Sequence, residues 1–220
     1  MTGAETIDDE NSSYTCAAKL LFGETVHPLN DVEYAGSITP ALSAVSPRYG
    51  TVTGGTEVTF SGTSFSDDTS KYTIIIDGIE CPVSAATSDS VTCTTGSRPG
   101  LRDSTLEINI DGVGTVSNRD ILFRYVSTWS DDTTWGGEFA PMEGETIYIP
   151  RGLNLLVDVD STPLLVAVLV EGSLIFAPDA DPIHHRYFDA KYIFVNGGTM
   201  EVGTEDFPYT SKITITMHSN

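Results

Sequence analysis

Three segments near the C-terminus share one pattern of apolar and polar positions. Residues 147–155, 168–176 and 194–202 each contain a short apolar run, a glycine and a second, alternating run. The glycines are Gly152, Gly172 and Gly198, so the unit recurs every 20 to 26 residues, which is the period of stacked β-coils. Because one coil cannot bury its apolar face alone, the pattern predicts a β-solenoid in which successive coils pack together.

A fourth unit begins at residues 213–217 and reaches the last residues without a turn. Solenoids normally finish with a polar capping repeat, so we expect the chain to end inside the array. We also expect one shared core, made of these residues: Leu153, Leu155, Leu174, Phe176, Ile193, Val195, Met200, Val202, Ile213 and Ile215.

The middle of the chain is also β by pattern. Residues 57–61 and 104–110 alternate apolar and polar positions, and residues 72–77 form a run rich in β-branched side chains. Turn signals such as Gly54-Gly55 and Asp77-Gly78 separate these runs. The sequence contains no amphipathic segment of helical length, and short strands at this spacing favour a β-sandwich.

Charge narrows the range of partners. The chain has 220 residues, with 31 Asp and Glu against 11 Lys and Arg, and a net charge of −20. Such a surface repels nucleic acid and anionic lipid, so we predict neither as a partner. The longest apolar run, residues 163–170, is far shorter than the roughly 20 residues of a membrane span, so we predict no membrane insertion by this segment. Residues 1–10 are acidic and polar, so a secretory signal would have to lie upstream.

Two of the three cysteines lie where a disulfide could form. Cys81 and Cys93 sit in strand-like stretches on either side of the turn-prone residues 84–89. A hairpin-like return would bring them within bonding distance, and closing this loop would stabilise the fold by roughly 2–3 kcal/mol. The alternative is two buried thiols in a reduced protein. Asn11 begins a glycosylation sequon, which agrees with an oxidising, extracellular setting.

The segment from residue 40 to 126 carries a family resemblance. The run Pro40 to Pro47 is followed by Gly54-Gly55-Thr56, and then by Gly62 and Phe65. In this order the residues resemble an IPT/TIG domain, which implies an immunoglobulin-like sandwich. Residues 1–39 resemble the second half of a preceding IPT/TIG domain, which would leave Cys16 without a partner in this chain. An unstructured linker is the alternative for residues 1–39.

Residues 127–220 resemble a second family, the G-eight domain named for its eight glycines. The matching positions are Trp129, Trp135, Gly144, Gly152, Asp158, Gly172, Gly197, Gly198 and Gly203, and Ser219 departs from the pattern where a glycine is expected. IPT/TIG repeats that lead into a G-eight domain resemble the fibrocystin family of large cell-surface proteins. The G-eight domain also occurs in hyaluronan-binding and hyaluronan-degrading proteins, where it precedes a β-helix.

Few residues suggest chemistry. Asp181, His184 and His185, together with Asp179, form the one cluster of potential metal ligands, but adjacent histidines diverge in an extended segment, so we predict no metal site and no cofactor. Asp158 and Asp160 are interpreted as solvated acids, with a structural role for Asp158 as the alternative. Trp129 and Trp135 are expected in the core, although sugar stacking is possible chemistry for both. No histidine lies in a motif with a nucleophile, so we predict no enzyme activity.

Three functions remain for testing. The first is a structural or adhesion segment of a fibrocystin-like protein at a cell or ciliary surface, whose parent is secreted or single-pass and whose partners are other domains of the same chain, extracellular proteins or glycans. The second is a glycan-binding or glycan-cleaving module, for which the C-terminal cationic candidates are Arg151, His184, His185, Arg186, Lys191 and Lys212. The third is a DNA-binding protein, because IPT/TIG sandwiches also occur in transcription factors, and the charge disfavours it.

Overall fold

The chain is all-β in the part that the structure describes. This computed structural model describes residues 13–17, 19–23, 25–28, 32–35, 39–116, 118, 120–179, 181–205 and 207–219. Apart from strands, these residues form two short 3-10 helices, η2 (Thr69–Lys71) and η3 (Asp132–Trp135), which confirms the predicted class. Among the described residues, no helix is both long and apolar enough to cross a membrane.

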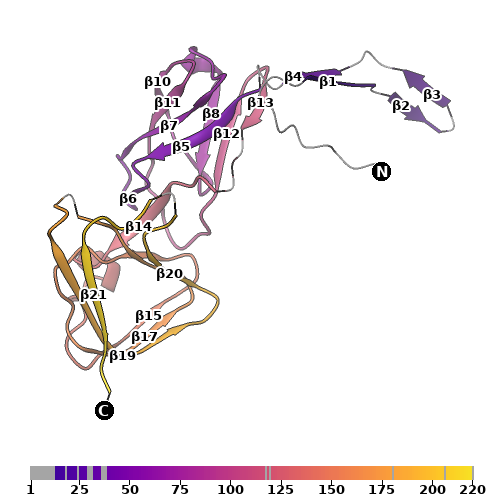
Figure 1. The fold of residues 1–220 in the computed structure, drawn as a ribbon. Helices are drawn as coiled ribbons and strands as arrows, with labels where there is room; N and C mark the ends of the chain where they lie inside the picture. Colours follow the sequence, from indigo (N-terminus) through magenta and orange to yellow (C-terminus); the bar gives the residue numbers. More distant parts are fainter. Residues whose placement is uncertain are drawn as a thin grey trace.

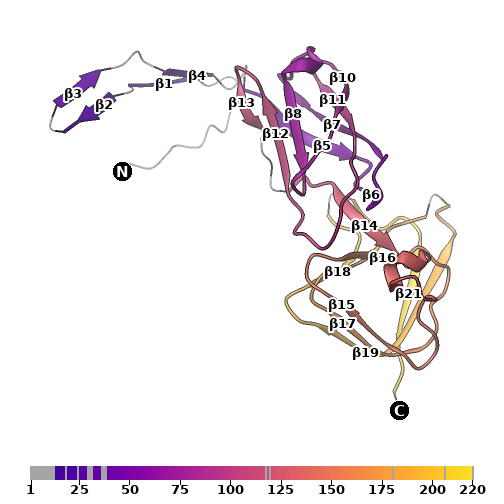
Figure 2. The ribbon, with the colours of Figure 1, turned by 180° about the vertical axis from the view of Figure 1, so that it is seen from behind.

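The N-terminal residues form two antiparallel strand pairs. β1 (Ser13–Cys16) pairs with β4 (Val32–Ala35), and β2 (Lys19–Phe22) pairs with β3 (Thr25–Pro28). Figures 1 and 2 show that these four strands project away from the rest of the molecule. β2 and β3 are exposed along their whole length.

Two antiparallel sheets form a sandwich in the middle of the chain. The first has the order β10-β11-β7-β5, and the second has the order β13-β12-β8-β9. The strands of the first sheet are β5 (Ala41–Ser46), β7 (Glu57–Thr63), β10 (Val83–Ala86) and β11 (Ser90–Thr94). Those of the second are β8 (Tyr72–Ile76), β9 (Ile79–Glu80), β12 (Leu106–Ile110) and β13 (Gly114–Val116).

The core of the sandwich comes from the alternation of the sequence. Val58 and Phe60 on β7, and Ile108 and Ile110 on β12, are buried between the sheets. The disulfide between Cys81 and Cys93 lies in this core, with a Cα–Cα distance of 5.5 Å. It ties the loop between β9 and β10 to β11, as the hairpin interpretation predicts.

The strands of the C-terminal part lie in two parallel sheets, one of which also includes β6 from the sandwich segment (Figure 2). One has the order β15-β17-β19-β21, and the other runs from β6 through β14, β16 and β18 to β20. The first comprises β15 (Thr146–Ile149), β17 (Leu165–Val170), β19 (His185–Val195) and β21 (Lys212–Met217). The second comprises β6 (Tyr49–Thr51), β14 (Arg124–Thr128), β16 (Asn154–Leu156), β18 (Ser173–Phe176) and β20 (Thr199–Val202).

The register of these sheets stays within one residue of the glycine spacing. Leu155 lies beside Leu174, and Leu174 lies beside Met200. In the other sheet Ile147 lies beside Val168, and Val168 beside Ile193. Leu174 and Met200 match the alignment on Gly172 and Gly198, whereas the pairs Leu155–Leu174 and Ile147–Val168 are shifted by one residue from the alignment on Gly152 and Gly172.

Eight of the ten predicted core residues contribute to one core. Leu155, Leu174 and Phe176 are buried in it, and Leu153, Ile193, Met200, Ile213 and Ile215 pack against it. The prediction is wrong for Val195 and Val202, whose side chains are exposed. Both end their strands, and β21 pairs with β19 only over His185 to Ala190, while β20 is the outer strand of its sheet.

Candidate functional site at the domain junction

One strand joins the sandwich to the parallel sheets. The first half of β14 pairs with β6 of the sandwich segment, and its second half pairs with β16. Tyr125 on β14 is buried in the first core, and Trp129, directly after β14, is buried in the second. Because β14 is hydrogen-bonded into a sheet along its whole length, bending the junction would break backbone hydrogen bonds.

A single carboxylate on β20 binds three side chains from the sandwich side of the junction. Tyr49 Oη donates to Glu201 Oε1 at 2.6 Å, and Arg124 Nη1 donates to Glu201 Oε2, also at 2.6 Å. Arg48 Nη2 lies 3.5 Å from Glu201 Oε1. Tyr49 and Arg124 lie about 150 and 80 residues before Glu201 in the chain, so the contact holds together segments that are distant in sequence.

The surroundings keep Glu201 ionised. Burial alone would raise the pKa of this carboxyl, but the Tyr49 hydrogen bond and the charges of Arg124 and Arg48 outweigh it and lower the pKa below its ordinary value. Burial and the hydrogen bond to Glu201 raise the pKa of Tyr49 to about 12. Tyr49 therefore remains a neutral donor and Glu201 a charged acceptor at physiological pH.

Arg48 adds a second contact across the junction. Its guanidinium carbon lies 4.3 Å from the centroid of the Phe207 ring and 5.3 Å from that of the Tyr49 ring. A guanidinium over an aromatic face is attracted by the ring quadrupole. Arg48 thus links the sandwich segment both to Glu201 and to the loop that follows β20.

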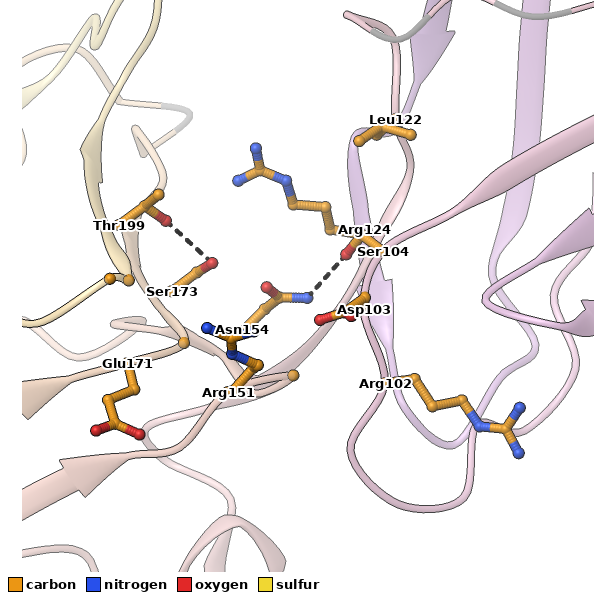
Figure 3. Close-up of a pocket in the computed structure, with 14 residues that line it drawn as sticks. Arg102, Asp103, Ser104, Leu122, Arg124, Arg151, Asn154, Glu171, Ser173 and Thr199 are labelled. Carbon is orange, nitrogen blue, oxygen red and sulfur yellow. Dashed lines mark hydrogen bonds between the residues drawn. The ribbon is translucent and has the colours of Figure 1, made fainter.

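A cleft of about 380 Å³ opens beside this contact (Figure 3). Arg124 and Arg151 line it together with the hydroxyl side chains of Ser104, Ser173 and Thr199. Thr199 Oγ1 donates to Ser173 Oγ at 3.0 Å. Arg102 is part of the wall, but in Figure 3 its guanidinium points away from Asn154 and the cleft. Cationic and hydroxyl groups together could hydrogen-bond an oxygen-rich ligand, although Asp103 and Glu171 also line the cleft.

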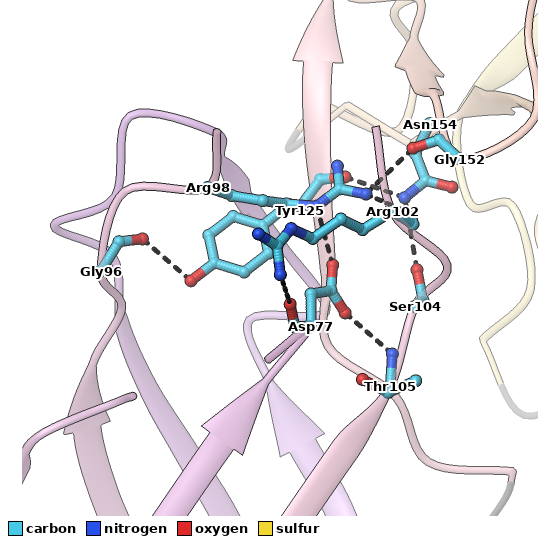
Figure 4. Close-up of polar contacts among 9 residues, drawn as sticks. All are labelled: Asp77, Gly96, Arg98, Arg102, Ser104, Thr105, Tyr125, Gly152 and Asn154. Atoms are coloured by element: carbon cyan, nitrogen blue, oxygen red, sulfur yellow. Dashed lines mark hydrogen bonds and ion pairs between the residues drawn. The ribbon is translucent and has the colours of Figure 1, made fainter. Parts of the chain in front are cut away.

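A buried ion pair lies beneath the junction (Figure 4). Arg98 Nε lies 3.0 Å from Asp77 Oδ2, and the two side chains are 1% and 0% exposed. Arg98 Nη2 also donates to the Gly152 carbonyl at 2.9 Å and to the Arg102 carbonyl. One buried guanidinium thus binds the sandwich core and the first glycine turn of the C-terminal part.

Three further polar atoms of this cluster bond to the backbone. Thr105 N–H donates to Asp77 Oδ1 at 2.8 Å, and Tyr125 Oη donates to the Gly96 carbonyl at 2.9 Å. Asn154 Nδ2 donates to the Tyr125 carbonyl at 2.9 Å. Burial raises the pKa of Asp77, against the lowering effect of the Thr105 hydrogen bond and of the charge on Arg98. The pair is therefore sensitive to the loss of either partner.

The backbone conformation and the space at position 152 require a glycine. Its φ is +83°, and a Cβ at this position would lie 2.8 Å from the Arg102 backbone nitrogen. A side chain would meet both a strained backbone and the sandwich segment. The glycine that begins the repeat is thus also a contact point between the two parts of the molecule.

The predicted metal candidates do not converge. Asp181 accepts a hydrogen bond from the Ile183 N–H, and His184 Nε2 lies 3.1 Å from Asp160 Oδ1. His185 turns elsewhere, with its ring stacked on Tyr187 and Nε2 2.8 Å from Thr214 Oγ1. No cluster of three or more His, Cys, Asp or Glu side chains suited to a metal occurs among the described residues.

Other predicted residues have structural contacts. Trp129 is buried, which excludes it from sugar stacking, and Trp135 Nε1 donates to the Trp129 carbonyl at 2.8 Å. Asp158 Oδ1 accepts from the Ser130 N–H at 2.9 Å, which is the structural alternative considered for it. Asn11 lies outside the described residues, and so does the side chain of Cys16.

The predicted cationic candidates are also dispersed. Arg151 lines the cleft, whereas Arg186 is paired with Asp179 at 3.0 Å and His184 with Asp160. The sequence pattern does not indicate a functional role for the junction residues Asp77, Arg98 and Glu201. Arg98 lies in a loop, and Glu201 occupies an ordinary polar position of an alternating strand, so no local signal distinguishes either residue.

The two parts of the chain match two domain families. Residues 40–125 match the IPT/TIG domain, and residues 134–220 match the G8 domain. The junction described above lies between the two matched segments and includes β14.

Curated relatives match over most of this chain. It is 33% identical to human Fibrocystin-L over 188 residues, which cover 85% of this chain and 4% of that protein. It is 27% identical to Fibrocystin from Canis lupus familiaris over 162 residues, which cover 73% of this chain and 4% of that protein. The chain thus spans about 4% of the length of these relatives.

Solved structures match a smaller part. The Plexin A4 full extracellular region is 26% identical over a match that covers 40% of this chain and 7% of that chain, with a TM-score of 0.36. A nutrient-binding protein from Bacteroides thetaiotaomicron gives a TM-score of 0.32 at 23% identity, over 44% of this chain and 25% of that chain. At these scores the likeness carries no argument about function.

Proposed function

Because this chain contains an IPT/TIG domain and a G8 domain and has homologues named Fibrocystin-L and Fibrocystin, we propose that it is a non-catalytic structural segment of a large cell-surface protein. Its task is to hold the two domains in one orientation. The observation that carries this proposal is the Glu201 carboxylate, which binds Tyr49, Arg124 and Arg48 across the junction.

The junction supports a rigid connection in three independent ways. β14 is shared by strands of both domains, the Glu201 cluster links β20 to β6 and β14, and Arg98 binds the Gly152 carbonyl. Domains in one chain move relative to each other unless their interface is extensive. A shared strand together with two polar clusters resists such motion.

We also propose how the chain divides into domains and how the G8 domain folds. We divide the chain into residues 1–39, a preceding IPT/TIG remnant or linker, residues 40–126, the IPT/TIG domain, and residues 127–220, the G8 domain. The paired sheets of parallel strands support the view that the G8 domain is the start of a β-helix, since strands of successive units stack in parallel.

An extracellular location is supported by the disulfide and the sequon. The Cys81–Cys93 bond persists in oxidising compartments. If the protein passes through the secretory pathway, Asn11 will carry a glycan, and Asn11→Gln will remove one glycan mass after secretion from a eukaryotic host. An unmodified Asn11 in secreted protein would contradict its role as an acceptor.

The structural role is tested by a double-mutant cycle across the junction. Arg124→Ala, Glu201→Ala and the double variant should give a coupling free energy of about 1–3 kcal/mol in chemical unfolding. The matched control pairs Arg124→Ala with Glu205→Ala, since Glu205 is an exposed acid four residues away, and its coupling should be near zero. Equal coupling in both cycles would refute an energetic role for the junction contact.

A second candidate function is glycan binding in the cleft. The observation that favours it is the set of Arg124, Arg151 and hydroxyl side chains in the wall of the cleft. A glycan array with and without calcium, repeated with Arg151→Ala, tests it. Binding that Arg151→Ala abolishes would support the candidate, while an array without signal under both conditions would remove it.

A further inference from the structure

A groove on the G8 domain exposes several aromatic side chains. Phe139 is 86% exposed, and Tyr148, on β15, is 54% exposed. Together with Trp135 and Pro141 they line a groove of about 410 Å³. Because exposed aromatic surface is disfavoured in water, a groove of this composition is typical of an interaction site.

Exposed side chains follow Tyr148 across the sheet that β15 forms with β17 and β19. Tyr148 lies beside Leu169 of β17, and Leu169 lies beside Phe194 of β19. Both Leu169 and Phe194 are exposed, and Tyr192 stacks on Phe194 with 5.9 Å between the ring centroids. An extended segment could therefore lie across three strands after entering the groove.

The charged side chains that line the groove are both acidic. Glu138 and Glu145 line it, and no lysine or arginine is among its lining residues. Tyr148 Oη donates to Glu171 Oε2 at 2.7 Å, which adds a third carboxylate beside the same ring. Aromatic faces attract ammonium and guanidinium groups through the ring quadrupole, and carboxylates attract them through their charge.

We propose that this groove, formed by Trp135, Glu138, Phe139, Pro141, Glu145 and Tyr148, binds a basic, extended segment of a partner protein, with an arginine or lysine side chain between the rings and the glutamates. The charge of the whole chain, −20, attracts such a partner at long range. The same charge repels anionic glycans, lipids and a second copy of this chain. A neutral glycan remains as a competing occupant for the test.

This inference does not depend on the proposed structural role. None of the residues that bind Glu201 or Arg98 lines the groove. A rigid junction could therefore exist without partner binding, and partner binding could exist on a flexible chain. The double-mutant cycle at the junction can therefore fail while the peptide titration of the groove succeeds, and the reverse.

The test uses the whole chain and a fluorescent, blocked peptide that alternates arginine and threonine. Its anisotropy is titrated at physiological salt, beside a peptide with glutamine in place of arginine. Phe139→Ala should weaken binding about two- to fivefold. Glu138→Gln with Glu145→Gln should weaken it about three- to tenfold, because two charge contacts are lost while the amide oxygen can still accept from the Met142 N–H.

Matched controls separate the groove from general attraction to an acidic protein. Glu57→Gln with Glu107→Gln removes two exposed charges from the sandwich, and Ile183→Ala removes an exposed apolar side chain from a distant loop; neither should change the affinity more than about twofold. The Trp135 indole resonance should shift on titration.

Three results would overturn the proposal. The first is equal weakening by the charge-matched control, and the second is equal affinity for the glutamine peptide. The third is peptide binding that leaves the Trp135 resonance unmoved. Binding of a neutral oligosaccharide that Phe139→Ala abolishes, without arginine-peptide binding, would assign the groove to the competing occupant.

Discussion

Glu201 shows how one residue can define a junction. Its carboxylate is nearly buried, yet both oxygens receive strong donors, so its charge is stabilised rather than costly. Removal of the charge would leave Arg48 and Arg124, which are partly exposed and can turn to water. The stability that is lost when Glu201 is substituted should therefore depend on whether the Glu201 carboxyl is ionised.

Glu201→Gln should destabilise the protein by about 1.5–3 kcal/mol at neutral pH, the usual range for hydrogen bonds to a charged group. Because the folded-state pKa of Glu201 lies below its ordinary value near 4.5, its contribution is present above that value and is lost as the pH falls through the lowered pKa. The difference between wild type and Glu201→Gln should thus shrink below about pH 4.5. Glu205→Gln is the control, and a difference that does not depend on pH would contradict the assignment.

Alanine substitutions of Arg98 and Arg102 should differ sharply in their cost to stability. Arg98→Ala should cost about 3–5 kcal/mol, since it leaves the Asp77 carboxylate buried without its cation. Arg102→Ala removes an exposed side chain that makes one long contact, 3.3 Å, with the Asp77 carbonyl, and should cost less than about 1 kcal/mol. Denaturant unfolding measures both, and equal costs would show that Arg98 is not the central residue.

At the scale of elements, stacked glycine turns and inward apolar residues hold the parallel sheets together. A Cβ on Gly198 would lie 2.4 Å from the Gly172 carbonyl oxygen, and one on Gly172 would lie 2.3 Å from the Leu153 carbonyl oxygen. These glycines are needed for space between successive turns. Next to each turn, a leucine or methionine enters the core.

Leu174→Ala should cost about 2–5 kcal/mol, because Leu174 is fully buried and the vacated volume cannot collapse completely. Leu169→Ala is the matched control on the adjacent sheet, where the side chain is exposed, and it should cost less than about 1 kcal/mol. The unfolding midpoints of the two variants and the wild type measure both costs. An unchanged midpoint for Leu174→Ala would count against a shared core.

The disulfide should stabilise the IPT/TIG domain by about 2–3 kcal/mol, since it closes a loop with a sequence separation of 12 residues. Unfolding of Cys81→Ala with Cys93→Ala, compared with wild type, measures this. Non-reducing peptide mapping should recover Cys81 linked to Cys93. A peptide that links Cys16 to either of them would contradict the pairing and the remnant domain.

Much of the fold is readable from local pattern, because alternation and glycine spacing are local. The strands of the sandwich, the pairing of Cys81 with Cys93 and the register of Leu174 and Met200 all follow from it, whereas Leu155 pairs one residue away from the position that the glycine alignment predicts. The exposure of Val195 and Val202 does not, since it depends on which strands lie beside them. The junction is equally hidden, because Glu201 meets Tyr49 and Arg124 only after both domains have folded.

At the scale of the whole molecule, the two features to consider are its net charge and the link between its two domains. A net charge of −20 disfavours contact between copies of the chain, and β14 and the two polar clusters link the two domains, which we propose to form one rigid body. Figures 1 and 2 show the result, with β14 between the sandwich and the parallel sheets in both views. The proposed structural role requires such a rigid connection between the two domains.

The central claim is that the IPT/TIG and G8 domains form one rigid body, and residual dipolar couplings test it most directly. Backbone N–H couplings are measured in one alignment medium for residues 40–125 and for residues 134–220. Both sets should fit a single alignment tensor, with the relative domain orientation of the structure. A markedly smaller tensor for one domain, or two tensors with different axes, would contradict the account.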